Sequence, residues 1–197
     1  RNITLLLIMM IAFAIVAYPP TGVWSRLMAI FDNIYQYFIN NYADTSLGMR
    51  FELWRAGWYM FKDSPVMGVG EGGVQVWLKS LASEGLLHED VAIYPQLHSD
   101  IIDTLARRGL LGLISLLLLY TAFAYAFAKK VLQANDNVRF RLLAISGLMV
   151  IIAFFDFGLS QAMFRDLRAF SGFLGFSVAI WACVGHQTQP VAPNKSR

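Results

Sequence analysis

The chain has 197 residues, of which 57% are hydrophobic and only 15% are charged, and its mean hydropathy is +0.51. These values exclude an ordinary soluble domain, in which about a quarter of the residues are charged. The formal net charge is +3 and the isoelectric point is about 9.1. Because the apolar residues form long blocks, we interpret the positive excess as loop charge that orients a membrane protein, and we expect no nucleic-acid binding.

Four apolar blocks have the composition of membrane-spanning helices, so we predict an all-α polytopic membrane protein with four transmembrane helices. The predicted spans are residues 1–18, 109–128, 142–157 and 170–185. The single cysteine, Cys183, lies in the last block, and no disulfide is therefore expected. Since the first residue is Arg1 rather than a methionine, we expect this chain to be the C-terminal portion of a longer protein.

The loop at residues 129–141 fixes the predicted orientation, because it carries four basic residues against one acidic residue. By the positive-inside rule this loop is cytoplasmic. Alternation then makes residues 186–197 a cytoplasmic tail, and it places residues 19–108 and the turn at 158–169 in the periplasm. In and beside that turn, four charged residues predict a salt-bridge cap on the outer face: Asp156, Arg165, Asp166 and Arg168.

The outward segment is too long to be a simple connection, and long loops usually carry function. Its pattern predicts a helix over 47–63, a second helical piece over 74–82, and an amphipathic helix that starts near Asp100 and enters the span at Gly109. The glycine-rich stretch 68–73 lacks the Gly-Lys-Ser/Thr of a nucleotide-binding loop, so we interpret it as a flexible turn.

His98 is the first candidate for chemistry, because it stands at the start of that amphipathic helix on the outer side. A neutral imidazole there could accept a proton as a general base, or it could be a structural histidine hydrogen-bonded to a loop. His88 with Glu89, Asp90 and His98 matches no common spacing of metal ligands, so no metal site is expected.

Arg50 and Arg55 lie on an aromatic helix that also carries Trp54 and Trp58. Guanidinium groups suit phosphate and diphosphate because two parallel hydrogen bonds match the oxygen geometry. The alternative is that these side chains anchor the loop at lipid headgroups.

Two motifs together resemble the O-antigen ligase and polymerase family of membrane glycosyltransferases. In the first, His98-Ser99 is followed after nine residues by Gly109 and Gly112, similar to the family's His-(Asn/Ser/Gln) and Gly-x-x-Gly signature. In the second, the segments 48–58 and 63–70 resemble the family's large periplasmic loop. The resemblance is close from residue 48 to about residue 119.

The resemblance implies a metal-independent, inverting glycosyltransferase that needs no cofactor and sits in the bacterial inner membrane with its active site facing the periplasm. Its donor would be a glycan linked to undecaprenyl diphosphate, and its leading acceptor would be the lipid A core oligosaccharide. The resemblance makes His98 the base and Arg50 the diphosphate ligand, with Arg55, Trp54 and Ser99 as further substrate-binding candidates.

Other functions remain open at this stage. An O-antigen or exopolysaccharide polymerase and a protein O-oligosaccharyltransferase of the same family share the motifs and differ in the acceptor. A transporter or a non-catalytic membrane scaffold belongs to a different class. The transporter is disfavoured because ionisable residues are absent from the centres of the four predicted spans.

Overall fold

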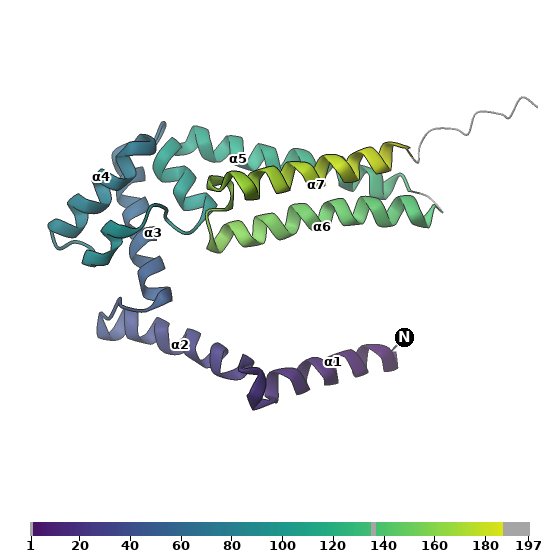
Figure 1. Ribbon diagram of the computed structural model, residues 1–197, viewed down its shortest axis with the longest axis horizontal. Coiled ribbons are helices and arrows are strands. Elements are labelled where there is room, and N and C mark those ends of the chain that lie inside the picture. The colour runs from purple at the N-terminus through teal and green to yellow at the C-terminus, as the bar shows by residue number, and fades with distance from the viewer. Residues whose placement is uncertain (1, 135–136, 187–197) are drawn as a thin grey trace, which may run out of the picture.

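A computed structural model describes residues 2–134 and 137–186, and this part of the chain is helical throughout, without strands (Figure 1). The α-helices are α1 (Asn2–Ala17), α2 (Val23–Asn40), α3 (Ser46–Asp63), α4 (Gly70–Ser83), α5 (Asp100–Leu132), α6 (Val138–Ser160) and α7 (Leu167–His186). Three short 3₁₀ helices lie between them: η1 (Pro19–Thr21), η2 (Glu89–Ile93) and η3 (Met163–Arg165).

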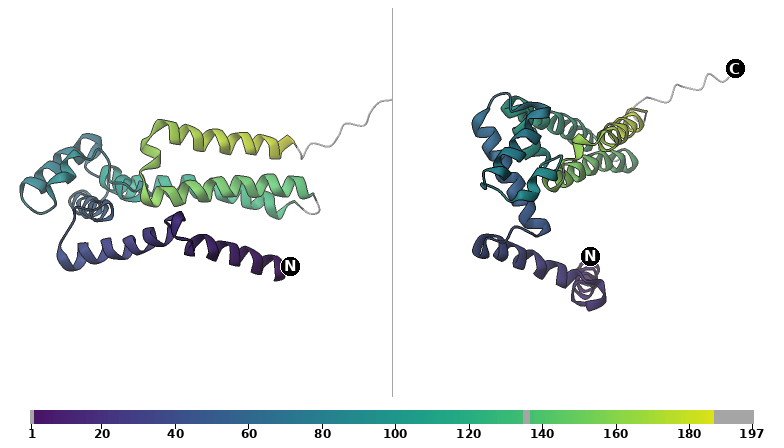
Figure 2. Two further views of the ribbon diagram at one scale, coloured as in Figure 1. Left: turned by 60° about the horizontal axis from the view of Figure 1, so that its bottom comes forward. Right: turned by 60° about the vertical axis from the view of Figure 1, so that its left-hand side comes forward.

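Three parts make up the molecule, and α3 joins them. The long helices α5, α6 and α7 lie alongside one another as a bundle, and α3 and α4 lie at the end where α5 begins (Figure 1). Helices α1 and α2 form an arm that α3 connects to the rest, and both views of Figure 2 place this arm to one side of the bundle. The two tails predicted at the cytoplasmic end, Arg1 and residues 187–197, lie outside the described residues, as do 135–136.

Within the described residues, three helices are long and apolar enough to cross a membrane, namely α5, α6 and α7. Their mutual contacts are largely aromatic: Tyr120 stacks on Phe164, and Phe173 packs edge-on against Phe123 and Phe154. Large apolar side chains on the outer faces of the same helices stay exposed, as expected of surfaces that face lipid.

Among the described residues three candidate spans are found where four were predicted, and helix α1, in the first predicted span at residues 1–18, is not among them. Helix α1 has 16 residues and ends before the Pro19-Pro20 pair, whose rings cannot continue a helix.

The core outside the bundle lies between α3, α4, η2 and the first turns of α5. Fully buried apolar side chains fill it, among them Leu53, Met60, Leu78, Val91 and Leu97. The predicted helix over 47–63 is confirmed as α3, with the Thr45 hydroxyl accepting the N–H of Gly48 as its N-terminal cap. Helix α4 begins earlier than predicted, at Gly70, so part of the glycine-rich stretch is helical.

Helix α5 is broken at Gly109. The break lies where the core of α3, α4 and η2 meets the core of the bundle α5 to α7. This glycine has φ 60° and ψ −156°, a conformation that residues with a side chain essentially never adopt. The turn after α3 replaces the hydrogen bonds that the break removes: Leu110 N–H donates to Pro65 C=O at 2.8 Å, and Val69 N–H donates to Ala106 C=O at 2.8 Å. The predicted amphipathic helix enters the span at Gly109 as expected. The backbone that approaches this glycine closely is the turn at Val66 and Met67.

Candidate functional site

His98 lies in the short link between η2 and α5, and its backbone has φ 49° in the left-handed region. Such a conformation costs a non-glycine residue on the order of 1–2 kcal/mol, so the surroundings must hold it. The buried ion pair between Asp103 and Arg107 holds it. The Asp103 carboxylate accepts the N–H of Leu97 at 3.1 Å, and the Arg107 guanidinium donates to Pro95 C=O at 2.9 Å. Leu97 directly precedes His98 and Pro95 lies three residues before it, so the strained position is fixed from the side of α5.

The imidazole of His98 has one defined polar partner. Its Nδ1 lies 2.7 Å from the Oε1 of Gln161, at the C-terminal end of α6, and its ring packs edge-on against Tyr94 with centroids 5.6 Å apart. With this amide oxygen as the acceptor, Nδ1 is the donor, and in a neutral imidazole Nε2 then keeps its lone pair. An imidazole held in this way can serve as an oriented general base through Nε2.

Ser99 and Asp100 anchor the start of α5. Ser99 is the N-terminal cap and is 3% exposed, and its carbonyl accepts the N–H of Asp103 at 2.8 Å. Asp100 is also buried, and its Oδ1 accepts the N–H of Phe164 at 3.0 Å. Because Phe164 belongs to η3, this bond holds the connection between α6 and α7, and with it Gln161, against the link 94–99 that carries His98, here called the His98 segment.

A cluster of arginines around Glu71 lies beside this segment and was missed by the sequence analysis. Glu71 Oε2 accepts from Arg107 at 3.2 Å and from Arg165 at 2.9 Å, and Glu71 Oε1 accepts from Arg108 at 2.5 Å. Partial burial by itself raises the pKa of the Glu71 carboxyl. The hydrogen bond from Arg165 and the three positive charges outweigh that effect, so the pKa is lowered.

The predicted salt-bridge cap on the outer face forms differently from the expectation. Arg168 pairs with Asp166 at 3.0 Å, and this partner lowers the pKa of the Asp166 carboxyl. Arg165 instead reaches Glu71 in α4. The charged turn between α6 and α7 therefore contributes to contacts between the two cores as well as to its own surface.

Arg50 lies in the second turn of α3 and is half-buried. Its guanidinium has no hydrogen-bond or ion-pair partner among the described residues, which leaves its donors available to a ligand. The His98 segment contacts the same helix further along, where Leu97 and Ile102 pack on Gly57. Arg50 is seven residues earlier, or about 10 Å along the helix axis.

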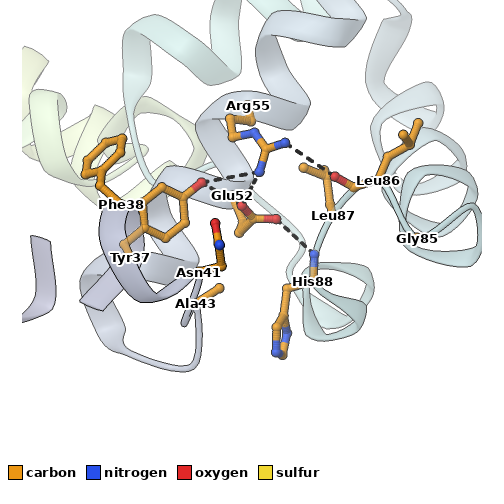
Figure 3. A pocket seen from close by; sticks show the side chains of 10 residues that line it. All are labelled: Tyr37, Phe38, Asn41, Ala43, Glu52, Arg55, Gly85, Leu86, Leu87 and His88. Atoms are coloured by element: carbon orange, nitrogen blue, oxygen red, sulfur yellow. Dashed lines mark hydrogen bonds and ion pairs between the residues drawn. The ribbon is translucent and has the colours of Figure 1, made fainter. Parts of the chain in front are cut away.

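Arg55 behaves differently, because a buried carboxylate neutralises it. Glu52 is 4% exposed, and its Oε1 accepts from Arg55 at 2.6 Å and from the Tyr37 hydroxyl at 2.6 Å. Its Oε2 accepts the backbone N–H of His88 at 2.9 Å (Figure 3). Burial first, and then the hydrogen bond to the Glu52 carboxylate, raise the pKa of the Tyr37 hydroxyl.

Trp54 is half-buried on α3, and its ring packs edge-on against Phe51 at 5.7 Å. Its indole Nε1 is buried without a hydrogen-bond partner in the described part of the chain. Trp54 lines an aromatic cavity of about 390 Å³ together with Tyr37, Phe38 and Arg55. Sequence spacing alone identified this aromatic face of α3.

Two larger cavities lie nearby. One of about 490 Å³ is bounded by α2, α3 and residues 85–88, and the other, of about 590 Å³, is mainly apolar and runs along α5 from Arg108 to Leu119. In residues 2–134 and 137–186, no group of three or more His, Cys, Asp or Glu side chains is placed to hold a metal ion. The expectation of a metal-independent reaction stays a prediction.

Comparison with known proteins adds two findings. The sequence model of a family described as O-antigen ligase matches residues 1–117, which is more than half of the chain and includes His98 and Gly112. Over 181 residues the chain is 26% identical to an uncharacterized protein of Haemophilus influenzae, and the match covers 89% of this chain and 45% of that protein. The chain thus spans less than half the length of this relative.

Proposed function

Because the chain belongs to the O-antigen ligase family, we propose that the complete protein is an O-antigen ligase of the bacterial inner membrane. It transfers a glycan from undecaprenyl diphosphate to the lipid A core oligosaccharide on the periplasmic side. The observation that carries this proposal is His98, a strained and oriented imidazole whose Nδ1 is occupied by Gln161 and whose Nε2 keeps its lone pair.

In the proposed reaction, His98 Nε2 takes the proton of the acceptor hydroxyl as its oxygen attacks the anomeric carbon. The bond between that carbon and the diphosphate oxygen breaks, and its electron pair leaves with the lipid diphosphate. Attack from the opposite face inverts the anomeric centre. Negative charge grows on the diphosphate, and Arg50 stabilises it with a guanidinium that has no protein partner among the described residues.

Trp54 and Arg55 contribute to substrate binding in this proposal. Trp54 lies on α3, one turn from Arg50, and Arg55 lies beside it with half of its side chain exposed. Ser99 is buried, which favours a role in holding His98 over direct contact with substrate. No metal or cofactor takes part in any of these steps.

Two variants test the division of roles. His98→Ala should reduce transfer by roughly 10²- to 10⁴-fold while donor affinity stays close to that of the parent, because the base contacts the acceptor and not the diphosphate. Arg50→Lys should weaken donor binding as well as the rate, because an ammonium cannot make the two-pronged contact. The measurements are initial rates and donor binding with purified protein in nanodiscs.

The outcome for each variant is decisive only if it inserts and accumulates normally, which quantitative membrane immunoblotting checks. Near-normal transfer by His98→Ala would show that the base is wrongly assigned. Donor affinity like the parent's in Arg50→Lys would favour headgroup anchoring for this arginine.

The acceptor is tested by analysing surface glycans in a deletion strain. Loss of polymer from the lipid A core, with long chains accumulating on the carrier, supports the ligase. Single repeats on the lipid A core would indicate a polymerase instead, and unchanged lipopolysaccharide with unglycosylated pilin would indicate a protein O-oligosaccharyltransferase.

A further inference from the structure

The cavity bounded by α2, α3 and residues 85–88 has the size and construction of a small-molecule site. Its volume is about 490 Å³, within the range of roughly 300–1,000 Å³ that is usual for ligand pockets. Figure 3 shows side chains from these separate segments around one space, with Tyr37 and Phe38 on one side and Leu86 and Leu87 on the other. The buried Glu52 links the walls through the hydrogen bonds that it accepts from Tyr37, Arg55 and His88.

The charge of this cavity argues against a phosphate ligand. Its carboxylate and its guanidinium, Glu52 and Arg55, are already paired at 2.6 Å. A diphosphate would have to compete with a buried carboxylate for that arginine, and it would be repelled by the same group. A neutral ligand meets neither obstacle.

The hydrogen-bonding groups that remain suit a ligand rich in hydroxyls. The side-chain amide of Asn41 faces the cavity and has no partner among the described residues, so both its donors and its acceptor are free. Arg55 has five N–H donors, and only one of them makes a short bond, to Glu52. A hydroxyl can donate to the first group and accept from the second.

Aromatic side chains provide the apolar part of the cavity. Phe38 is 63% exposed, and it packs edge-on against Tyr37 with centroids 5.0 Å apart. A sugar ring combines a face of C–H groups with a rim of hydroxyls, so it can lie on such rings while its rim meets Asn41 and Arg55. Neither a lipid tail nor a phosphate combines these two properties.

We infer that this pocket binds a sugar of the glycan substrate, so that Arg55 contacts hydroxyls while Arg50 holds the diphosphate. The inference rests on the proposed glycosyltransferase function for its choice of ligand, but the pocket shares none of its lining residues with the proposed base or diphosphate ligand. It also connects the site to the arm, because Tyr37 and Phe38 belong to α2.

Two substitutions test the pocket without disturbing the core. Leu86→Trp fills the cavity from an exposed position, and Asn41→Gly removes the amide at φ 52°, a conformation that glycine adopts without strain. Val76→Trp, on an exposed position of α4 outside this lining, is the matched control. All three should unfold at the same temperature as the parent.

The probe is the free repeat-unit oligosaccharide, released from its lipid by mild acid so that it has no diphosphate. Its equilibrium affinity for the complete natural protein in nanodiscs should fall roughly fivefold in Asn41→Gly, the equivalent of a lost hydrogen bond of about 1 kcal/mol, and further in Leu86→Trp. Val76→Trp should bind like the parent, and inorganic diphosphate should not displace the oligosaccharide.

Parent-like binding in both pocket variants, absence of binding by the parent, or displacement by diphosphate would each overturn the inference. The proposed function is judged separately, because His98→Ala and Arg50→Lys should bind the free oligosaccharide as the parent does. If His98→Ala still transfers glycan while Leu86→Trp loses oligosaccharide binding, the assigned base fails and the sugar pocket stands. If His98→Ala fails to transfer while both pocket variants bind normally, the base stands and the pocket fails.

Discussion

At the scale of single residues, the partner of His98 comes from a distant part of the chain. Gln161 lies 63 residues later and reaches the imidazole at 2.7 Å. It contacts no reacting atom in the proposed mechanism, so it is a positioning residue. In the proposed mechanism its amide oxygen accepts from Nδ1, which leaves Nε2 as the basic nitrogen.

Gln161→Leu should therefore lower kcat roughly fivefold, the kinetic equivalent of one hydrogen bond of about 1 kcal/mol, and leave the KM for the donor near the parent value. Gln161→Asn keeps an amide on a shorter side chain, and Gln161→Glu keeps the side-chain length and an acceptor oxygen. The kcat of Gln161→Asn should therefore be lower than that of Gln161→Glu. Steady-state kinetics in nanodiscs measure both parameters.

Ser160→Ala is the control for the end of α6, because that hydroxyl only contacts Phe157 C=O of its own helix, at 3.5 Å. If Gln161→Leu changes KM and not kcat, Gln161 is part of the substrate site and the positioning role is wrong.

At the scale of helices, Glu71 connects three elements. Glu71 lies in the first turn of α4, and its carboxylate forms ion pairs with Arg107 and Arg108 of α5 and with Arg165 of η3. Because these charges lower its pKa below the ordinary value of 4.5, the carboxylate stabilises the folded protein where it is ionised. That contribution is complete above the ordinary pKa and is lost as the pH falls through the lowered one.

Glu71→Gln should accordingly lower the unfolding temperature at pH 7, and the difference from the parent should shrink as the pH falls below about 4.5 toward the lowered pKa. Scanning fluorimetry of the purified protein at a series of pH values measures it. Glu89→Gln, at an exposed carboxylate of η2, is the control and should leave the unfolding temperature nearly unchanged at every pH. A difference for Glu71→Gln that grows in acid would contradict the assigned sign.

At the scale of the whole molecule, the predicted orientation follows from the basic residues between α5 and α6. On this prediction α3, α4 and η2 face the periplasm, and the far end of α5 faces the cytoplasm. Three crossings by α5, α6 and α7 then bring the end of α7 to the cytoplasmic side, as predicted.

Cysteine labelling tests this orientation. In a Cys183→Ala background, Glu89→Cys should react with a membrane-impermeant thiol reagent in cells whose outer membrane is permeabilised, whereas Leu132→Cys should react only after lysis. Both positions are exposed, and Leu132 is 84% exposed at the end of α5. The reverse pattern would remove both the orientation and the periplasmic chemistry that depends on it.

The parts of the fold that were predictable depend on local signals. Helix α3 was found because a capping residue starts it and Ser64-Pro65 ends it, and the spans α5 to α7 were found because their apolar runs are long. The first predicted span, whose helix α1 ends before Pro19-Pro20, is not among the candidate spans of the described residues.

The site was predictable where a motif marks it and not where distant segments meet. His98, Gly109 and Gly112 were identified by their spacing. Gln161, Glu52 and Glu71 were not, because each acts on residues that lie far away in the sequence, and no local pattern distinguishes a glutamine at a helix end from its many solvated counterparts.

The break at Gly109 has a consequence for how the protein assembles during synthesis. The turn at 64–69 leaves the ribosome before α5, yet it supplies the carbonyl groups that the amides of Leu110 and Leu111 need at the head of the span. A span that inserted before this turn had docked would carry unpaired amides at the membrane surface. We therefore expect docking of the turn to be coupled to insertion of the span, so that a defect in the turn lowers the amount of protein in the membrane.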